Sequence, residues 1–150
     1  MISIIDNQMG NIKSVSNALK YLGIEHVITT NPSELALSDG VILPGVGNFS
    51  QASLRLRDSG FYQEILTHCE KNKPFLGICL GMQLLFDSGS EGGQFSGLKL
   101  IPGNVSNLLN RVKNLPLPHI GWNELILKES RILEGIDNGD CCYFVHGFEV

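Results

Sequence analysis

The residues best suited to chemistry are one cysteine and the two glycines beside it. Cys79 lies in the segment Gly77-Ile78-Cys79-Leu80-Gly81, which has the Gly-x-Cys-x-Gly frame of a nucleophile elbow, with sulfur in place of a serine oxygen. A strained strand-to-helix turn brings backbones close together, so a side chain at Gly77 or Gly81 would collide with a neighbouring strand or helix. The pattern predicts that the Cys79 thiol points out over a sheet as a nucleophile.

A position at the start of a helix favours the thiolate form of Cys79. The first N–H groups of a helix have no partner within the helix, and the helix dipole places positive potential there. The backbone N–H of Leu80 would also point toward the oxygen of an attacked carbonyl, as half of an oxyanion hole. An arbitrary cysteine in an apolar run is more often an inert core residue. The flanking glycines and the strand-to-helix switch favour the nucleophile.

Alternating strands and helices are expected to position this turn. The apolar run 75–78, introduced by Pro74, predicts a central strand, and the spacing of apolar residues over 80–86 predicts the helix that follows. The chain before it predicts strands at 1–5, 24–29 and 40–43, helices at 11–22, 50–58 and 61–72, and a helical turn at 32–35. This order indicates an α/β fold with a mostly parallel central sheet flanked by helices.

Beyond Asp87 the pattern changes to a loop at 88–93 and then to short segments typical of strands and hairpins. These segments lie at 98–101, 105–109, 125–127 and 141–150, and they predict a small antiparallel region in the C-terminal half. The last of them is aromatic-rich and stops without a turn, and an unprotected apolar strand invites aggregation unless another strand pairs with it. We therefore expect a single domain over 1–150 that is truncated at its C-terminus.

Composition excludes several classes of protein. A chain of 150 residues with 43% hydrophobic and 17% charged residues can bury the core of one globular domain. Its apolar runs are too short to cross a bilayer, and the first residues lack the basic region and cleavage site of a signal peptide. A net charge of −4 argues against a nucleic-acid partner. We expect a cytoplasmic protein that binds neither membranes nor nucleic acids.

The four cysteines do not indicate disulfides or a metal. Thiols persist in a reducing compartment, and no zinc-ligand spacing is present. Cys141 and Cys142 are adjacent, so on a strand their side chains would point to opposite faces and could not bind one metal together. Cys69, Cys141 and Cys142 are interpreted as packing residues, and neither a metal nor a cofactor is expected.

Taken together, these segments resemble the class I, or triad, glutamine amidotransferases, and more narrowly the glutaminase subunits of imidazole glycerol phosphate synthases. Besides the cysteine turn, the resemblance is carried in order by 4–6 with 9–15, by Leu43-Pro44-Gly45-Val46-Gly47, by Pro118-His119-Ile120-Gly121-Trp122-Asn123 and by Tyr143-Phe144-Val145-His146. It implies a flavodoxin-like fold and the hydrolysis of the side-chain amide of glutamine by Cys79. The ammonia released would pass to a second active site.

The resemblance also implies roles for other residues. Val46 would supply the second oxyanion donor, and the glycines on each side of it would permit a peptide flip that presents or withdraws its N–H. Glu91 would meet the substrate ammonium, although a generic surface residue is about as good an interpretation. The substrate-binding positions implied are Gly47, Gln83, Glu91 and Gly147.

Two departures from the family pattern affect function. Asn7-Gln8 stand where the family usually has Tyr-Gly, and the His-Pro-Glu segment that carries the family's catalytic histidine and glutamate is not in this chain. Of the histidines His26, His68, His119 and His146, only His146 resembles a position near the family's site, as a neighbour of the pocket. We expect the chain alone to hydrolyse glutamine poorly or not at all.

The partner implied by the resemblance is a (β/α)₈-barrel cyclase that forms a heterodimer with this subunit. His119, Trp122 and Asn123 would lie at the interface, and a core tryptophan is an equally weighted alternative for Trp122. The pair would make imidazole glycerol phosphate and aminoimidazole carboxamide ribonucleotide in histidine biosynthesis. Two other interpretations remain: a glutaminase for a surface-sugar amidotransferase, or a pseudo-glutaminase binding subunit without the triad histidine and glutamate.

Overall fold

The computed structural model describes residues 1–111 and 116–150, which form two compact units. The first comprises Met1–Ser106 with Val150, and the second comprises Asn107–Glu149. A single domain over the whole chain therefore stays a prediction.

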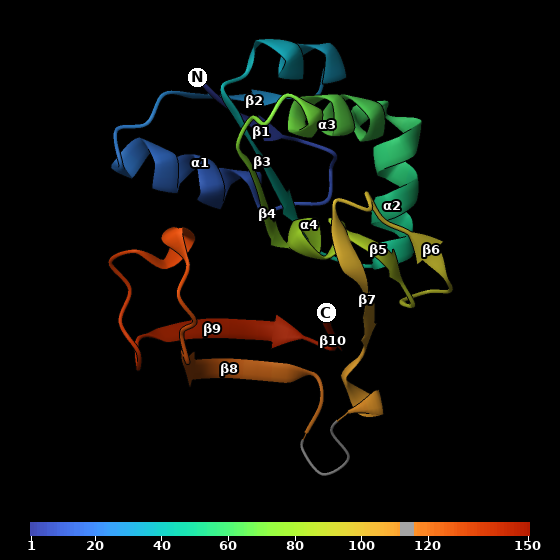
Figure 1. The fold of residues 1–150 in the computed structure, drawn as a ribbon, viewed down its shortest axis with the longest axis vertical. Helices are drawn as coiled ribbons and strands as arrows, with labels where there is room; N and C mark the ends of the chain where they lie inside the picture. The colour runs from blue at the N-terminus through green and yellow to red at the C-terminus, as the bar shows by residue number, and fades with distance from the viewer. Residues whose placement is uncertain (112–115) are drawn as a thin grey trace. The chain divides into compact units, whose positions relative to one another are not determined.

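The first unit is built on a four-stranded sheet whose strand order is β2-β1-β3-β4 (Figure 1). Every neighbouring pair is parallel, which confirms the predicted α/β class. The strands are β1 (Ile2–Ile5), β2 (His26–Thr29), β3 (Gly40–Gly45) and β4 (Phe75–Cys79). The prediction of a central strand at 75–78 is wrong for this sheet, since β4 lies at its edge. An apolar run shows only that a strand can be covered on both faces, and its neighbours in the sheet depend on distant segments.

Helices cover both faces of this sheet. Figure 1 shows α1 (Ile12–Tyr21) on one side and α2 (Phe49–Asp58) and α3 (Phe61–Glu70) on the other, with the 3₁₀ helix η1 (Pro32–Leu37) between β2 and β3. Asparagine side chains fix the beginnings of three of these helices by accepting backbone N–H bonds, at Asn11, Asn31 and Asn48. In the described ranges, no helix combines the length and the apolar character that crossing a bilayer requires.

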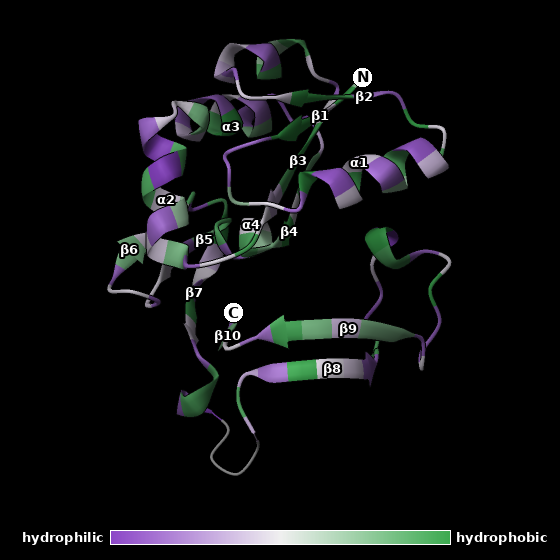
Figure 2. Ribbon diagram, turned by 180° about the vertical axis from the view of Figure 1, so that it is seen from behind, coloured by the Kyte–Doolittle hydropathy of each residue, from purple (hydrophilic) through white to green (hydrophobic). Residues whose placement is uncertain are grey.

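The core of the first unit follows from side-chain alternation along β1 and β3. Ile4 and Ile42 are paired in register and form a cluster with Leu19 of α1. Ile5 and Leu43, one residue further along each strand, point to the opposite face and are fully buried. In Figure 2 the green of hydrophobic residues accordingly runs along the strands of this sheet, whereas hydrophobic and hydrophilic residues alternate along the helices. Burial of each side chain of this kind stabilises the folded state by about 1.5–3 kcal/mol relative to leaving it exposed.

After β4 the chain makes one helical turn, α4 (Leu80–Gln83), and then three strands, β5 (Phe86–Gly89), β6 (Phe95–Ser96) and β7 (Ile101–Asn107). β5 pairs antiparallel with β6 and parallel with β7. The predicted helix over 80–86 and the predicted strand over 98–101 are both wrong in extent, for one reason. The N–H of Leu98 donates to the Leu84 carbonyl, and the N–H groups of Leu100 and Ile101 donate to the Leu85 carbonyl. These two carbonyls bond to a distant segment, so the helix ends before them.

The second unit contains an antiparallel hairpin of β8 (His119–Glu124) and β9 (Cys141–His146), which confirms the predicted antiparallel region. Its other elements are the 3₁₀ helices η2 (Leu108–Asn110) and η3 (Arg131–Leu133) and the short strand β10 (Phe148–Glu149). The predicted strand at 125–127 is wrong, because β8 ends at Glu124 and the N–H of Leu127 donates to the side chain of Asn138 instead.

Candidate active site

Cys79 occupies a strained turn between β4 and α4. It is the last residue of the strand and the N-cap of the helix, with φ 55° and ψ −115°. A non-glycine residue in such a sparsely populated conformation costs about 1–3 kcal/mol, and strain of this kind is concentrated at functional sites. The side chain is exposed. The predicted strand-to-helix turn and the outward thiol are thus present in the structure.

The glycines around Cys79 allow three backbones to meet. A Cβ at Gly77 would lie 2.6 Å from the backbone of Met82, and one at Gly81 would lie 1.8 Å from the carbonyl oxygen of Leu43 in β3. A Cβ at Gly45 would lie 2.8 Å from the amide nitrogen of Gly81. The collisions predicted for Gly77 and Gly81 are confirmed, and Gly45 is a third such position.

The helix that begins at Leu80 is shorter than predicted. Because α4 is a single turn, few peptide dipoles are aligned behind Cys79. Leu80 is the first residue of this turn, so its N–H has no acceptor within the helix and its position suits an oxyanion donor. The side chain of Leu80 is 2% exposed and anchors the turn in the core.

The loop after β3 lies next to Cys79, because Gly45 and Cys79 are paired in the parallel register of β3 and β4. Val46 follows directly, with an exposed side chain. Its backbone N–H donates to the carbonyl oxygen of Met9, with 2.5 Å between nitrogen and oxygen. Val46 N–H, the predicted second oxyanion donor, is therefore engaged by another acceptor in this structure.

The segment that holds Val46 includes the unusual Asn7-Gln8 pair. The carboxylate of Asp6 accepts from the N–H of Gln8, and the side chain of Asn7 accepts from the N–H of Met9. Gln8 has φ 63°, a left-handed conformation that glycine adopts without cost. These bonds fix the turn that presents the Met9 carbonyl to Val46.

Three of the predicted substrate-binding residues lie in the first unit. Gln83 is the last residue of α4 and is half-buried, and Gly47 has φ +110° and follows the Val46 loop. Glu91 accepts a hydrogen bond from the N–H of Phe49 through Oε2, at 2.9 Å. Since Phe49 is the first residue of α2, this carboxylate caps the positive end of a helix.

The other predicted residues lie in the second unit. Gly147 accepts from the N–H of Leu108 through its carbonyl oxygen. Trp122 is 71% exposed, which excludes it from the core of the described chain. It shares one face of the hairpin with Ile120, Tyr143 and Val145, all more than half exposed, and its ring lies edge-to-face with that of Tyr143.

The remaining cysteines differ from each other. The four thiols are all free in this structure. Cys69 is half-buried, and burial raises the pKa of its thiol. Cys141 and Cys142 are exposed, so their interpretation as packing residues is wrong. They lie at the start of β9, a strand of a two-stranded sheet, where the second unit covers neither face of the ribbon at these positions.

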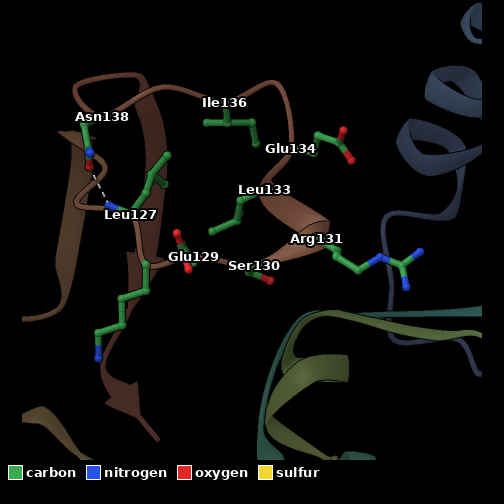
Figure 3. Close-up of a pocket in the computed structure, with 9 residues that line it drawn as sticks. Leu127, Glu129, Ser130, Arg131, Leu133, Glu134, Ile136 and Asn138 are labelled. Atoms are coloured by element: carbon green, nitrogen blue, oxygen red, sulfur yellow. Dashed lines mark hydrogen bonds between the residues drawn. The ribbon is translucent and has the colours of Figure 1, made fainter.

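Among the cavities that described residues line, two lie in the second unit, and sequence reasoning missed both. One, of about 530 Å³, is formed by residues of the 127–138 loop, and Figure 3 shows Leu133 and Ile136 turned toward Leu127 while Arg131 points away. The other, of about 560 Å³, is lined by His119, Asn123, His146 and apolar side chains. Neither cavity is lined by Cys79. No local sequence pattern indicated a cavity in either place.

Comparison with protein families and curated proteins gives a consistent result. The family model described as glutamine amidotransferase class-I matches residues 3–150. A protein of Caldanaerobacter subterraneus subsp. tengcongensis, named imidazole glycerol phosphate synthase subunit HisH, is 51% identical over 151 residues, covering 100% of this chain and 73% of that protein. The subunit of the same name from Aquifex aeolicus is 47% identical and covers 98% and 70%.

Solved structures show the same fold at low sequence identity. A structure titled as a glutamine amidotransferase superposes with a TM-score of 0.74 at 19% identity, covering 96% of this chain and 70% of that one. A structure titled as a GMP synthase subunit from Thermoplasma acidophilum superposes with a TM-score of 0.64 at 20% identity, covering 99% and 65%.

Proposed function

Because the chain belongs to the glutamine amidotransferase class-I family, we propose that it is the glutaminase subunit of an imidazole glycerol phosphate synthase. In this role it hydrolyses glutamine to glutamate and ammonia, and a (β/α)₈-barrel cyclase uses the ammonia to make imidazole glycerol phosphate for histidine biosynthesis. The observation that carries the proposal is the strained turn that exposes Cys79 beside the Val46 loop. The names of relatives 41–51% identical to the chain support the choice of synthase.

The chemistry assigned to these residues is acyl transfer. The Cys79 thiolate attacks the amide carbon of glutamine, a carbon–sulfur bond forms, and the carbonyl oxygen takes up negative charge. The N–H groups of Leu80 and Val46 are the donors proposed to stabilise this oxygen. The carbon–nitrogen bond then breaks, ammonia leaves with a proton from a general acid, and water later cleaves the thioester with a general base. Glu91 and Gln83 hold the amino-acid end of the substrate in this proposal.

The bond between Val46 and Met9 gives this glutaminase an off state. While Val46 N–H donates to Met9, it cannot stabilise the oxyanion, and of the two proposed donors the N–H of Leu80, the first residue of α4, remains. Rotation of the Gly45–Val46 peptide frees the N–H, and glycine at both flanking positions keeps that rotation sterically open. We assign the trigger for the rotation to occupation of the cyclase.

Selective labelling of Cys79 tests the nucleophile. A glutamine analogue with an electrophilic side chain is expected to modify Cys79 much faster than Cys141 or Cys142, which are also exposed and serve as controls. Cys69 is a weak control, because burial raises the pKa of its thiol and slows it in any case. Excess glutamine should protect Cys79 alone. Equal labelling of Cys79, Cys141 and Cys142 would remove the basis for a glutaminase.

Association with a cyclase tests the partner. A (β/α)₈-barrel cyclase should bind the chain, and Trp122→Ala should weaken binding by about 2 kcal/mol or more, roughly 30-fold, as expected of a buried tryptophan at an interface. Tyr21→Ala is the matched control, since Tyr21 is an aromatic residue 91% exposed on α1. Absence of binding, or equal effects of the two variants, would contradict the proposed interface. The labelling experiment on Cys79 tests the glutaminase separately, and its result does not depend on this one.

A further inference from the structure

His68 is a buried histidine whose two ring nitrogens are in different situations. It lies in α3 and is 3% exposed. Its Nε2 lies 3.1 Å from the carbonyl oxygen of Pro74, whereas its Nδ1, which is also buried, has no hydrogen-bond partner among the described residues. Folding takes such an atom out of water, so leaving it unpartnered costs free energy, and its missing partner has to be identified.

The contact with Pro74 determines what kind of partner Nδ1 needs. A carbonyl oxygen only accepts, so the ring proton of a neutral His68 has to be on Nε2. Unlike a side-chain amide, a backbone carbonyl cannot be turned to present a donor. The same oxygen also accepts from the N–H of Val41 at 3.0 Å, which fixes its position beside β3. Nδ1 therefore carries a lone pair, and its partner is a hydrogen-bond donor.

A small cavity lies beside His68, between α3 and the 3₁₀ helix η1. Its volume is about 10 Å³, close to the smallest space that holds one water molecule. Besides His68, its polar lining residues are Glu64, Thr67, Lys71 and Lys73. A buried water makes about two to four hydrogen bonds to polar groups, so both the size and the lining of this cavity fit a single water.

Lys73 supplies a second contact for such a water. Its backbone N–H donates to the carbonyl oxygen of His68 at 3.4 Å, which keeps the two residues together. Its Nζ donates to the carbonyl oxygens of Ser38 at 2.7 Å and of Ala36 at 3.2 Å. An ammonium group has three N–H bonds, so these two contacts leave one proton for a further acceptor.

The charges around the cavity exclude an ion as the occupant. A metal cation would be repelled by the ammonium groups of Lys71 and Lys73, which both line the cavity. An anion such as chloride has no proton to give to His68 Nδ1. A neutral molecule with one heavy atom that both donates and accepts satisfies both sides, and water has these properties.

We propose that one structural water occupies this cavity, where it accepts from Lys73 Nζ and donates to His68 Nδ1. Its second proton is directed to the polar groups of Glu64 and Thr67. The water joins α3 to the turn that precedes β4 and completes the hydrogen bonding of a buried histidine. Because Cys79 is at the other end of β4, this inference does not depend on the proposed glutaminase function.

NMR of the unmodified chain tests the site. Long-range proton–nitrogen correlations should show His68 protonated on Nε2 alone. Its Hε1, the carbon-bound proton next to Nδ1, should show a nuclear Overhauser effect to a long-lived water. His26 is the control and should show none, because both of its ring nitrogens contact protein groups, in Ser16 and Ile24. A proton on Nδ1 of His68, or no contact between its Hε1 and water, would overturn the proposal.

A substitution tests the same site by counting waters. Magnetic relaxation dispersion of the water oxygen nucleus reports how many waters stay bound for longer than the protein takes to tumble. His68→Phe keeps a ring but removes the acceptor, so this number should fall by one, whereas His26→Phe should leave it unchanged. An unchanged number in His68→Phe would overturn the proposal, and the NMR result on the unmodified chain decides the matter if this variant does not fold.

Discussion

The backbone N–H of Val46 donates to the carbonyl oxygen of Met9 with only 2.5 Å between the two atoms. Val46 comes one residue after Gly45, which is paired in register with Cys79. A backbone donor next to the proposed nucleophile is therefore held by the turn at Asn7–Gly10. That bond has to break before Val46 N–H can stabilise an oxyanion, so it links the conformation of two loops to the reactivity of one thiol.

Removal of this N–H tests its role in acylation. With an occupied cyclase bound, so that Val46 N–H is free of Met9, Val46→Pro is expected to slow the acylation of Cys79 by a γ-glutamyl ester about 10²–10³-fold, the usual cost of losing one oxyanion donor. Val46→Ala keeps the N–H and should acylate at the rate of the unmodified chain. Alkylation of Cys79 by iodoacetamide needs no oxyanion and should be the same in both variants. Equal acylation of the proline and alanine variants would show that Val46 is not the donor.

The chain of 150 residues is expected to release less than one equivalent of ammonia per Cys79 and then to stop. No His-Pro-Glu segment is present to protonate the departing ammonia or to supply the general base that activates water, so both the formation and the hydrolysis of the thioester should be slow. His146 is unsuited to replace it, because both of its ring nitrogens are bonded, to His119 and to Phe148. Ammonia measured against Cys79 should rise slowly and never exceed one equivalent. Continuous turnover abolished by His146→Ala would contradict this expectation.

Local patterns predicted the first 70 residues well because the elements there are determined locally. In α1 the apolar face, the Asn11 cap and the following Gly23 all agree, and the helix was placed to within one residue at each end. The Cys79 turn was predictable for a similar reason. Glycines at 77 and 81 are required by contacts that an elbow makes wherever it occurs.

The remaining differences come from contacts between distant residues. The length of α4 depends on Leu98 and Leu100, which bond from more than ten residues away to the two carbonyls that directly follow the helix. Glu91 caps α2, which begins 42 residues earlier, and nothing in its glycine-rich loop indicates this bond. The contacts between His119, Asn123 and His146 require the hairpin register, which the sequence pattern left open.

Substitution of Glu91 separates its two roles. Glu91→Gln keeps an oxygen for the N–H of Phe49 and should cost little stability, whereas Glu91→Ala should cost about 1 kcal/mol through loss of the cap. If Glu91 also meets the substrate ammonium, both variants should label at least ten-fold more slowly with the glutamine analogue, because a charged hydrogen bond contributes about 1.5–3 kcal/mol. Urea midpoints and labelling rates measure the two effects. Unchanged labelling rates in both variants would show that Glu91 caps α2 but does not bind the substrate ammonium.

The close approach of β3 to the Cys79 turn predicts a large stability effect at Gly81. In Gly81→Ala the new Cβ would lie 1.8 Å from the carbonyl oxygen of Leu43, a backbone atom that cannot move without shifting β3. We expect a loss of more than about 3 kcal/mol in the free energy of unfolding, at the upper end for overpacking. Gly23→Ala is the control in the same unit: Gly23 has φ +68° and nothing within 4 Å, so only backbone strain of about 1–2 kcal/mol applies. Equal urea midpoints for the two variants would show that β3 and α4 do not approach as closely as this structure places them.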